Sequence, residues 1–109
     1  MRISPRRYRN KETGKTVEAI VFLNMDMGHD IAAWCGGRFL LAKNPLKEYA
    51  HIELVPESEN VTYRAYPGDY VVRDIENDTF FIVAAKTFRE QYNCIDLTDS
   101  RVINLYRSI

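Results

Sequence analysis

The chain contains two histidines and two cysteines that could bind zinc or act in nucleophilic catalysis: His29, Cys35, His51 and Cys94. A zinc site usually takes two ligands from one turn or one helix face, which requires CxxC or HxxxH spacing. No pair of the four has that spacing. A cysteine nucleophile also needs a base beside it, and the sequence places neither histidine next to a thiol. We therefore expect structural histidines and thiols, no metal, no other cofactor and no enzymatic activity.

Two acidic motifs have a structural explanation as well as a chemical one. Residues 74–78 place oxygen ligands at alternate positions, as a calcium loop begins, but the bend glycine and the acidic twelfth position of such a loop are absent. This segment is predicted to be a solvated hairpin tip. Asp69 could act as a general base, yet Pro67-Gly68-Asp69 has the composition of a tight turn in which the aspartate bonds back to the chain. We interpret Asp69 as a turn residue.

Aromatic and arginine side chains cluster on neighbouring predicted strands and could form a binding surface. Phe80 and Phe81 are consecutive, so on a strand they face opposite sides, and one of them points outward unless something covers it. Aromatics beside arginines suit stacking on bases or on a protein partner, whereas packing within the sheet is the alternative. The candidate ligand- or partner-binding residues are Arg64, Tyr66, Asp69, Tyr70, Arg73 and Phe80.

The formal net charge is zero, but the charge is unevenly distributed. Residues 1–17 carry six basic side chains and one acidic side chain, and the remainder of the chain is acidic on balance. A basic arm of this kind can contact nucleic acid, here through Arg6, Arg7 and Arg9, or it can pair with its own acidic body. Both interpretations remain open at this stage.

The elements that must position these residues fit one domain over residues 1–109, with 46% apolar and 28% charged side chains. No apolar run is long enough to span a membrane, and no apolar segment follows the N-terminal arginines as a secretory signal requires. Two cysteines are too few for a disulfide scaffold, which favours free thiols in a reducing compartment. We expect a cytoplasmic protein that does not interact with membranes.

Hydrophobic alternation predicts many strands and only two short helices. Residues 1–15 are expected to form a basic N-terminal arm or the first half of a hairpin, and residues 66–92 a strand–hairpin–helix module. Hairpins are frequent and no βαβ unit repeats, so we predict an α+β fold: a mostly antiparallel sheet with two short helices packed on one face. The predicted strands span residues 6–10, 16–23, 38–42, 51–55, 61–65, 70–73, 79–83 and 101–106, and the predicted helices span residues 26–35, which Gly36-Gly37 ends, and 84–92.

The module over residues 66–92 contains Pro67-Gly68-Asp69-Tyr70, a hairpin, the aromatic strand at residues 80–83 and a short helix that ends in Phe88-x-x-x-Tyr92. With these features it resembles a family of small bacteriophage and prophage proteins. The module is also similar to the bacterial domain named for a Pro-Gly-Asp-Tyr-Gly motif, with Val71 in the place of the last glycine. The resemblance spans roughly residues 17–92. It implies a viral or prophage origin, expression in a bacterial cytoplasm and an accessory role, and it carries no assigned activity.

Together these observations favour a phage-type accessory binding protein without catalytic activity. It would engage a host protein or a small ligand, and a homodimer is one form in which it could do so. The alternatives are a nucleic-acid-binding protein that uses the basic arm, and a minor virion-assembly protein.

Overall fold

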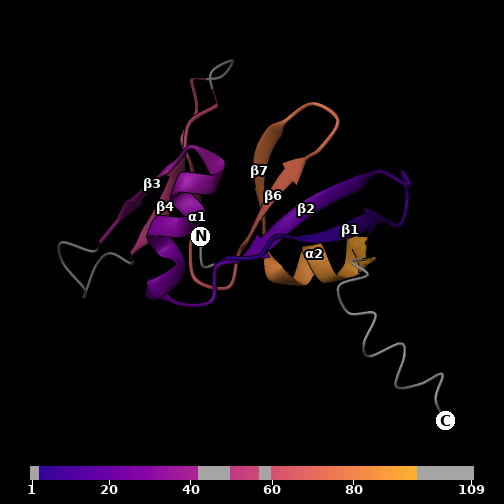
Figure 1. The fold of residues 1–109 in the computed structure, drawn as a ribbon, viewed down its shortest axis with the longest axis horizontal. Helices are drawn as coiled ribbons and strands as arrows, with labels where there is room; N and C mark the ends of the chain where they lie inside the picture. Colours follow the sequence, from indigo (N-terminus) through magenta and orange to yellow (C-terminus); the bar gives the residue numbers. More distant parts are fainter. Residues whose placement is uncertain (1–2, 42–49, 57–59, 96–109) are drawn as a thin grey trace, which may run out of the picture.

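The computed structural model describes residues 3–41, 50–56 and 60–95. These residues contain two α-helices and eight strands, and the strands form two antiparallel sheets. The predicted α+β fold is therefore confirmed (Figure 1). The larger sheet has the strand order β7-β6-β2-β1-β8, and the smaller has the order β3-β4-β5. The elements are β1 (Arg6–Asn10), β2 (Thr16–Val21), a 3-10 turn (Met25–Met27), α1 (Gly28–Cys35), β3 (Arg38–Leu40), β4 (His51–Leu54), β5 (Tyr63–Ala65), β6 (Tyr70–Asp74), β7 (Thr79–Val83), α2 (Ala85–Gln91) and β8 (Tyr92–Cys94).

The basic N-terminal segment is a strand inside the larger sheet. β1 pairs with β2 on one side and with β8 on the other. The β1–β2 turn is held by Asn10, whose Oδ1 accepts hydrogen bonds from the backbone N–H groups of Glu12 and Thr13, each at 2.9 Å. This Asx-type turn explains why the chain reverses there. Of the two forms expected for residues 1–15, the hairpin is the one observed.

The Pro67-Gly68-Asp69 turn leads into the β6–β7 hairpin, as predicted. Gly68 has φ +102°, in the region that glycine adopts without strain. The Asp69 N–H donates to the Tyr66 carbonyl at 2.9 Å, and the Asp69 carboxylate accepts from the Tyr66 N–H at 2.9 Å. At the tip of the hairpin, Asp74 Oδ1 accepts from the N–H of Glu76 at 3.0 Å.

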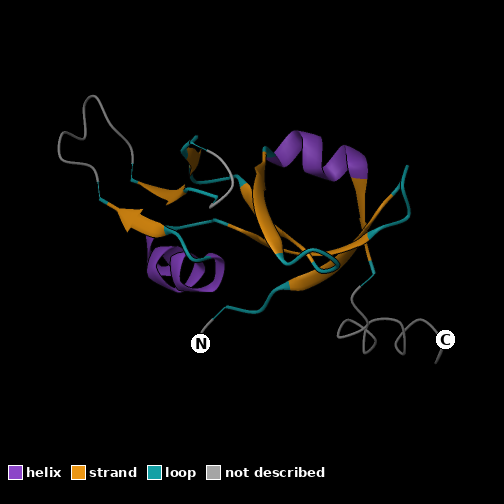
Figure 2. Cartoon of the chain, turned by 90° about the horizontal axis from the view of Figure 1, so that it is seen from above, coloured by secondary structure: helices purple, strands orange, loops and turns teal. Residues whose placement is uncertain are grey.

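The two helices cover opposite faces of the larger sheet, and in this respect the prediction of helices on one face is wrong. α2 lies across one face and connects β7 with β8 at the two edges (Figure 2). Its Phe88 packs with Val17, Ala19 and Val72. α1 packs with the smaller sheet on the other face, in a cluster that includes Val71. Val71 and Val72 are both buried because each strand face has its own partner, and the alternating sequence pattern does not show this.

Other boundaries differ modestly from the predictions. A 3-10 turn replaces the first residues of the predicted helix at 26–35. The chain becomes extended at Tyr92, so β8 takes over the end of the second predicted helix and pairs with β1. The predicted strand at residues 101–106 lies outside the described residues. In the part of the chain that is described, no helix is both long and apolar enough to cross a membrane.

Candidate functional site: the cationic face of the first hairpin

The pleat of β1 divides its arginines between the two faces of the sheet. Arg7 lies opposite Glu18 on β2, and Arg9 lies opposite Thr16. Because alternate residues share a face, Arg7, Arg9, Thr16 and Glu18 all lie on the side away from α2. Two residues along a strand span about 7 Å, which sets the spacing of the two arginines along β1. We call Arg7, Arg9 and Thr16, together with Lys15 at the adjoining hairpin turn, the cationic face.

The acidic side chain closest in register to Arg7 is already engaged by another arginine. Arg73 Nη1 donates to Glu18 Oε1 at 2.8 Å, and Arg73 Nε donates to Asp78 Oδ1 at 2.8 Å. Hydrogen bonds to these two carboxylates, that to Asp78 first, raise the pKa of Arg73. Arg73 is therefore neutralised within the fold. The exposed side chains of Arg7 and Arg9 form no ion pair or hydrogen bond with any other described residue.

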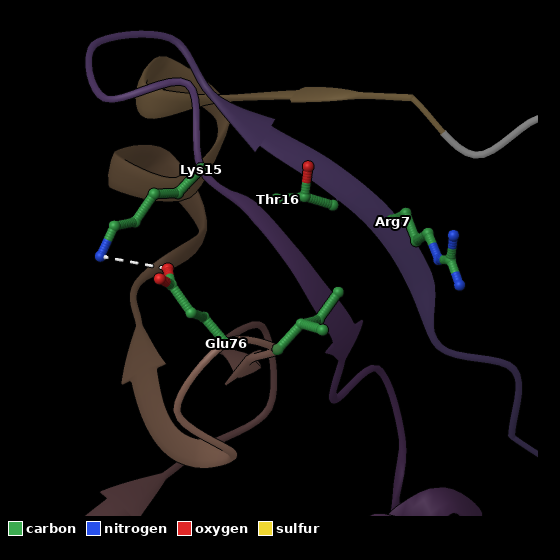
Figure 3. A pocket seen from close by; sticks show the side chains of 5 residues that line it. Arg7, Lys15, Thr16 and Glu76 are labelled. Carbon is green, nitrogen blue, oxygen red and sulfur yellow. Dashed lines mark ion pairs between the residues drawn. The ribbon is translucent and has the colours of Figure 1, made fainter.

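A shallow hollow of about 390 Å³ lies beside Arg7 and is also lined by Lys15, Thr16, Ile75 and Glu76 (Figure 3). Lys15 Nζ lies 3.8 Å from Glu76 Oε2, and these side chains are 57% and 73% exposed. Arg7 points away from this pair (Figure 3). An exposed ion pair at such a distance contributes about 0–1 kcal/mol to stability. An incoming anion can therefore displace Glu76 from Lys15 at little cost.

The cationic face can bind anions. Guanidinium groups bind phosphate and carboxylate oxygens with fixed geometry, and Arg7 and Arg9 can each engage a separate phosphate. No thiol or imidazole belongs to this face. Cys35 is buried elsewhere, where desolvation raises the pKa of its thiol, and Cys94 is exposed. Among the described residues no group of three or more His, Cys, Asp or Glu side chains could hold a metal ion.

The predicted nucleic-acid-binding residues are therefore separated by the structure. Arg7 and Arg9 lie together on the cationic face, whereas Arg6 lies on the face that α2 covers and has an interaction partner of its own. This separation follows from the strand assignment alone, because successive side chains of a strand point to opposite faces. Arg7 and Arg9 therefore share one face, and Arg6 lies on the other.

Four of the six predicted partner-binding residues lie in or next to β6 and β7, and each of the four is engaged there within the fold. Asp69 closes its turn, and Arg73 bridges two carboxylates. The Tyr70 ring stacks on Phe88 with the centroids 4.0 Å apart. The Phe80 ring meets Trp34 edge to face at 5.1 Å, so Phe80 packs inward. The outward member of the consecutive pair is Phe81, with 36% of its surface exposed.

The other two predicted residues, Arg64 and Tyr66, lie together on the smaller sheet. Glu53 on the central strand β4 lies between Arg38 on β3 and Arg64 on β5. Its carboxylate oxygens lie 3.0 Å from Arg38 Nη2, 3.6 Å from Arg64 Nε and 3.5 Å from His51 Nε2. The hydrogen bond from Arg38 is the largest of the effects that lower the pKa of Glu53.

This pKa shift predicts an acid-sensitive contribution to stability. The pKa of Glu53 is lower in the folded protein than its ordinary value of 4.5. The ionised Glu53 side chain therefore contributes fully to the free energy of unfolding when the pH is above this ordinary value. Its contribution is lost as the pH falls through the pKa of the folded state. Carbon-detected NMR titration should give a Glu53 midpoint below 4.5. In Arg38→Ala the midpoint should move upward, since the main donor is gone. An unchanged midpoint in Arg38→Ala would show that the hydrogen bond is not the cause.

Comparison of the chain with protein-family models, with curated proteins and with solved structures finds no match. The resemblance to the phage family therefore stays a prediction.

Proposed function

We propose that this chain is a non-catalytic binding protein that holds a nucleic acid on the cationic face of its first hairpin. The observation that carries the proposal is the pair Arg7 and Arg9, two exposed guanidinium groups on one face of a strand, with no carboxylate among the described residues paired to either. Phosphate contacts from arginine supply most of the affinity of sequence-independent nucleic-acid binding. Together with the phage resemblance, the proposal sets this activity in a bacterial cytoplasm, in an accessory role.

The surroundings of the two arginines support binding to a phosphate chain rather than to one compact anion. The arginines follow the strand direction, and Lys15 extends the positive charge to the hairpin turn beside the hollow. Glu18, which lies on the same face as the two arginines, is held by Arg73 at 2.8 Å. Repulsion of phosphates by Glu18 is thereby reduced. The size of the face limits the footprint to a few phosphates, so we expect weak binding that depends strongly on salt.

Replacing both arginines in Arg7→Ala/Arg9→Ala should abolish most of this binding. Fluorescence anisotropy with labelled 20-nucleotide single-stranded and duplex probes measures it across a salt series. Two phosphate contacts predict roughly a tenfold loss of wild-type affinity between 50 and 200 mM salt. The double variant should show a slope of log affinity against log salt that is shallower by about 1.4–1.8. Glu76→Gln should tighten binding, because it removes the carboxylate that competes for Lys15.

The matched control is Lys86→Ala/Arg89→Ala, which removes two exposed positive charges from α2 instead. It should keep the wild-type salt slope. Absence of salt-dependent binding in the wild type, or an equal loss in the control variant, would reject the cationic face as the site. Size-exclusion chromatography with light scattering on the same samples tests whether the chain forms a homodimer.

A further inference from the structure

The outer face of the smaller sheet carries a row of charged side chains across its three strands. In register, Arg38, Glu53 and Arg64 lie side by side on β3, β4 and β5. Two guanidinium groups share one carboxylate, so the row has a formal charge of +1. The side chains of Arg38 and Arg64 are 75% and 52% exposed, whereas that of Glu53 is 14% exposed. Glu53 thus positions the two guanidinium groups, and both side chains remain exposed to a partner.

The hydrogen-bonding capacity of the two arginines is only partly used in this row. Arg38 donates to Glu53 through Nη2 at 3.0 Å. Arg64 Nε lies 3.6 Å from the other carboxylate oxygen, which is an ion pair beyond hydrogen-bond length. A guanidinium group has five N–H donors. Both arginines can therefore donate hydrogen bonds to a further carboxylate while they keep their contacts with Glu53.

A second row, formed by Leu40, His51 and Tyr66, runs beside the charged one. Leu40 lies opposite His51, and the Tyr66 ring centroid lies 5.5 Å from that of His51. Alternation places these residues on the same face as the charged row, about 7 Å along the strands. Tyr66 is one of the large apolar side chains that are exposed in the described part of the chain. Tyr63, which is also exposed, pairs in register with Leu54 and therefore lies on the opposite face.

We propose that this face, the Arg38–Tyr66 surface, docks an acidic segment of a partner protein that also carries an apolar side chain. The partner's carboxylates would bind Arg38 and Arg64, and its apolar side chain would pack on Tyr66. Tyrosine and arginine are the residue types that dominate the energetics of protein interfaces. Exposed apolar patches on a polar surface mark such interfaces. This surface belongs to the other sheet, so the proposal does not depend on nucleic-acid binding by the first hairpin.

A nucleic acid fits this surface less well than a protein does. Interfaces with nucleic acids are more polar and much more positive than those with proteins. Here Glu53 occupies the centre of the charged row, and the row beside it contains Leu40 and Tyr66. A row of formal charge +1 offers little to a dense phosphate chain, whereas one or two carboxylates with an apolar neighbour match it.

The test uses three fluorescein-labelled twelve-residue peptides and the full chain. The first contains Asp and Glu with one Leu and one Tyr, the second replaces its acids by Asn and Gln, and the third keeps the acids but replaces Leu and Tyr by Ser. The first should bind, and the other two should bind at least fivefold more weakly. Chemical-shift changes in the NMR spectrum of the wild type should centre on Arg64 and Tyr66.

Arg38→Ala/Arg64→Ala should weaken binding of the first peptide about tenfold. Lys86→Ala/Arg89→Ala, with the same change of charge on α2, should not. Because the first double variant leaves Glu53 without its arginines and can affect folding, Tyr66→Ala provides an independent test with an expected loss of about fivefold. Tyr66 is 38% exposed, and its hydrogen bonds with Asp69 are made by its backbone N–H and carbonyl groups, which the substitution keeps.

Three results would overturn this proposal. They are no binding of the first peptide to the wild type at millimolar concentration, equal binding of the neutral peptide, and wild-type affinity in Tyr66→Ala together with Arg38→Ala/Arg64→Ala. Loss of oligonucleotide binding in Arg38→Ala/Arg64→Ala, but not in Arg7→Ala/Arg9→Ala, would instead assign this surface to nucleic acid. The two proposals therefore fail separately.

Discussion

Phe88→Ala should lower the free energy of unfolding by about 3–5 kcal/mol, the usual cost of truncating a buried phenylalanine. Phe88 is 1% exposed and is the buried residue through which α2 packs on the larger sheet. Its ring stacks between Tyr70 at 4.0 Å and Tyr92 at 4.5 Å, and it meets Tyr8 edge to face at 4.8 Å. The substitution removes all three ring contacts and leaves a cavity between strands β1, β6 and β8.

A loss of this size is large against the total stability of a domain, about 5–15 kcal/mol. It should appear in urea unfolding as a lower midpoint and in thermal unfolding as a fall of more than about 12 °C. Phe88→Leu should lower the free energy of unfolding much less, because leucine keeps most of the buried apolar area. The remaining loss comes from the ring stacking. Phe81→Ala deletes the same atoms from a side chain that is 36% exposed, so it should cost well under half as much. Equal losses in Phe81→Ala and Phe88→Ala would contradict the packing described for α2.

The parts of the fold that the sequence predicts well are those determined by neighbours along the chain. The Asn10 turn and the Pro67-Gly68-Asp69 turn are set by short-range backbone and side-chain hydrogen bonds. Strand periodicity near these turns then predicts the hairpins β1–β2 and β6–β7. The helix at residues 28–35 was predicted on the same local grounds.

The parts that were missed depend on contacts between distant segments. The sequence shows that Phe80 and Phe81 face opposite ways, but only the position of Trp34 on α1 decides which of them is buried. In the same way, only the pairing of β3, β4 and β5 brings Arg38 and Arg64 onto Glu53, fifteen and eleven residues away along the chain. Register is set by packing over the whole sheet, and a single sequence does not reveal it.

The candidate site was predictable to an intermediate degree. The basic composition of the N-terminal segment pointed to Arg7 and Arg9. The predicted strand implies that these two residues lie on the same face, as the structure shows. The neutralisation of Arg73 by Glu18 was not predictable, because the two residues meet only when β2 pairs with β6. Composition therefore locates a cationic strand, and only the tertiary structure shows which of its charges remain available.

Gly37→Ala gives the second large expected effect, a loss of about 2–3 kcal/mol from overpacking. Gly36 and Gly37 both read as helix-ending glycines, but the structure gives them different roles. Gly36 has φ +74°, and an added Cβ would meet nothing within 4 Å. A Cβ on Gly37 would collide with the backbone carbonyl oxygen of Glu53, which cannot move aside without disturbing the sheet. Gly36 is thus needed for its backbone conformation, and Gly37 for the close approach of β4.

These roles predict opposite responses to asparagine, which tolerates the left-handed conformation but needs more space than alanine. Gly36→Asn should be more stable than Gly36→Ala, whereas Gly37→Asn should be at least as destabilised as Gly37→Ala, all measured by urea unfolding. Arg38 directly follows Gly37 and pairs with Glu53 at 3.0 Å. A displaced β3 should therefore also weaken acidic-peptide binding at the Arg38–Tyr66 surface in Gly37→Ala and leave it intact in Gly36→Asn. Wild-type stability in Gly37→Ala would mean that β3 and β4 do not approach as closely as the structure shows.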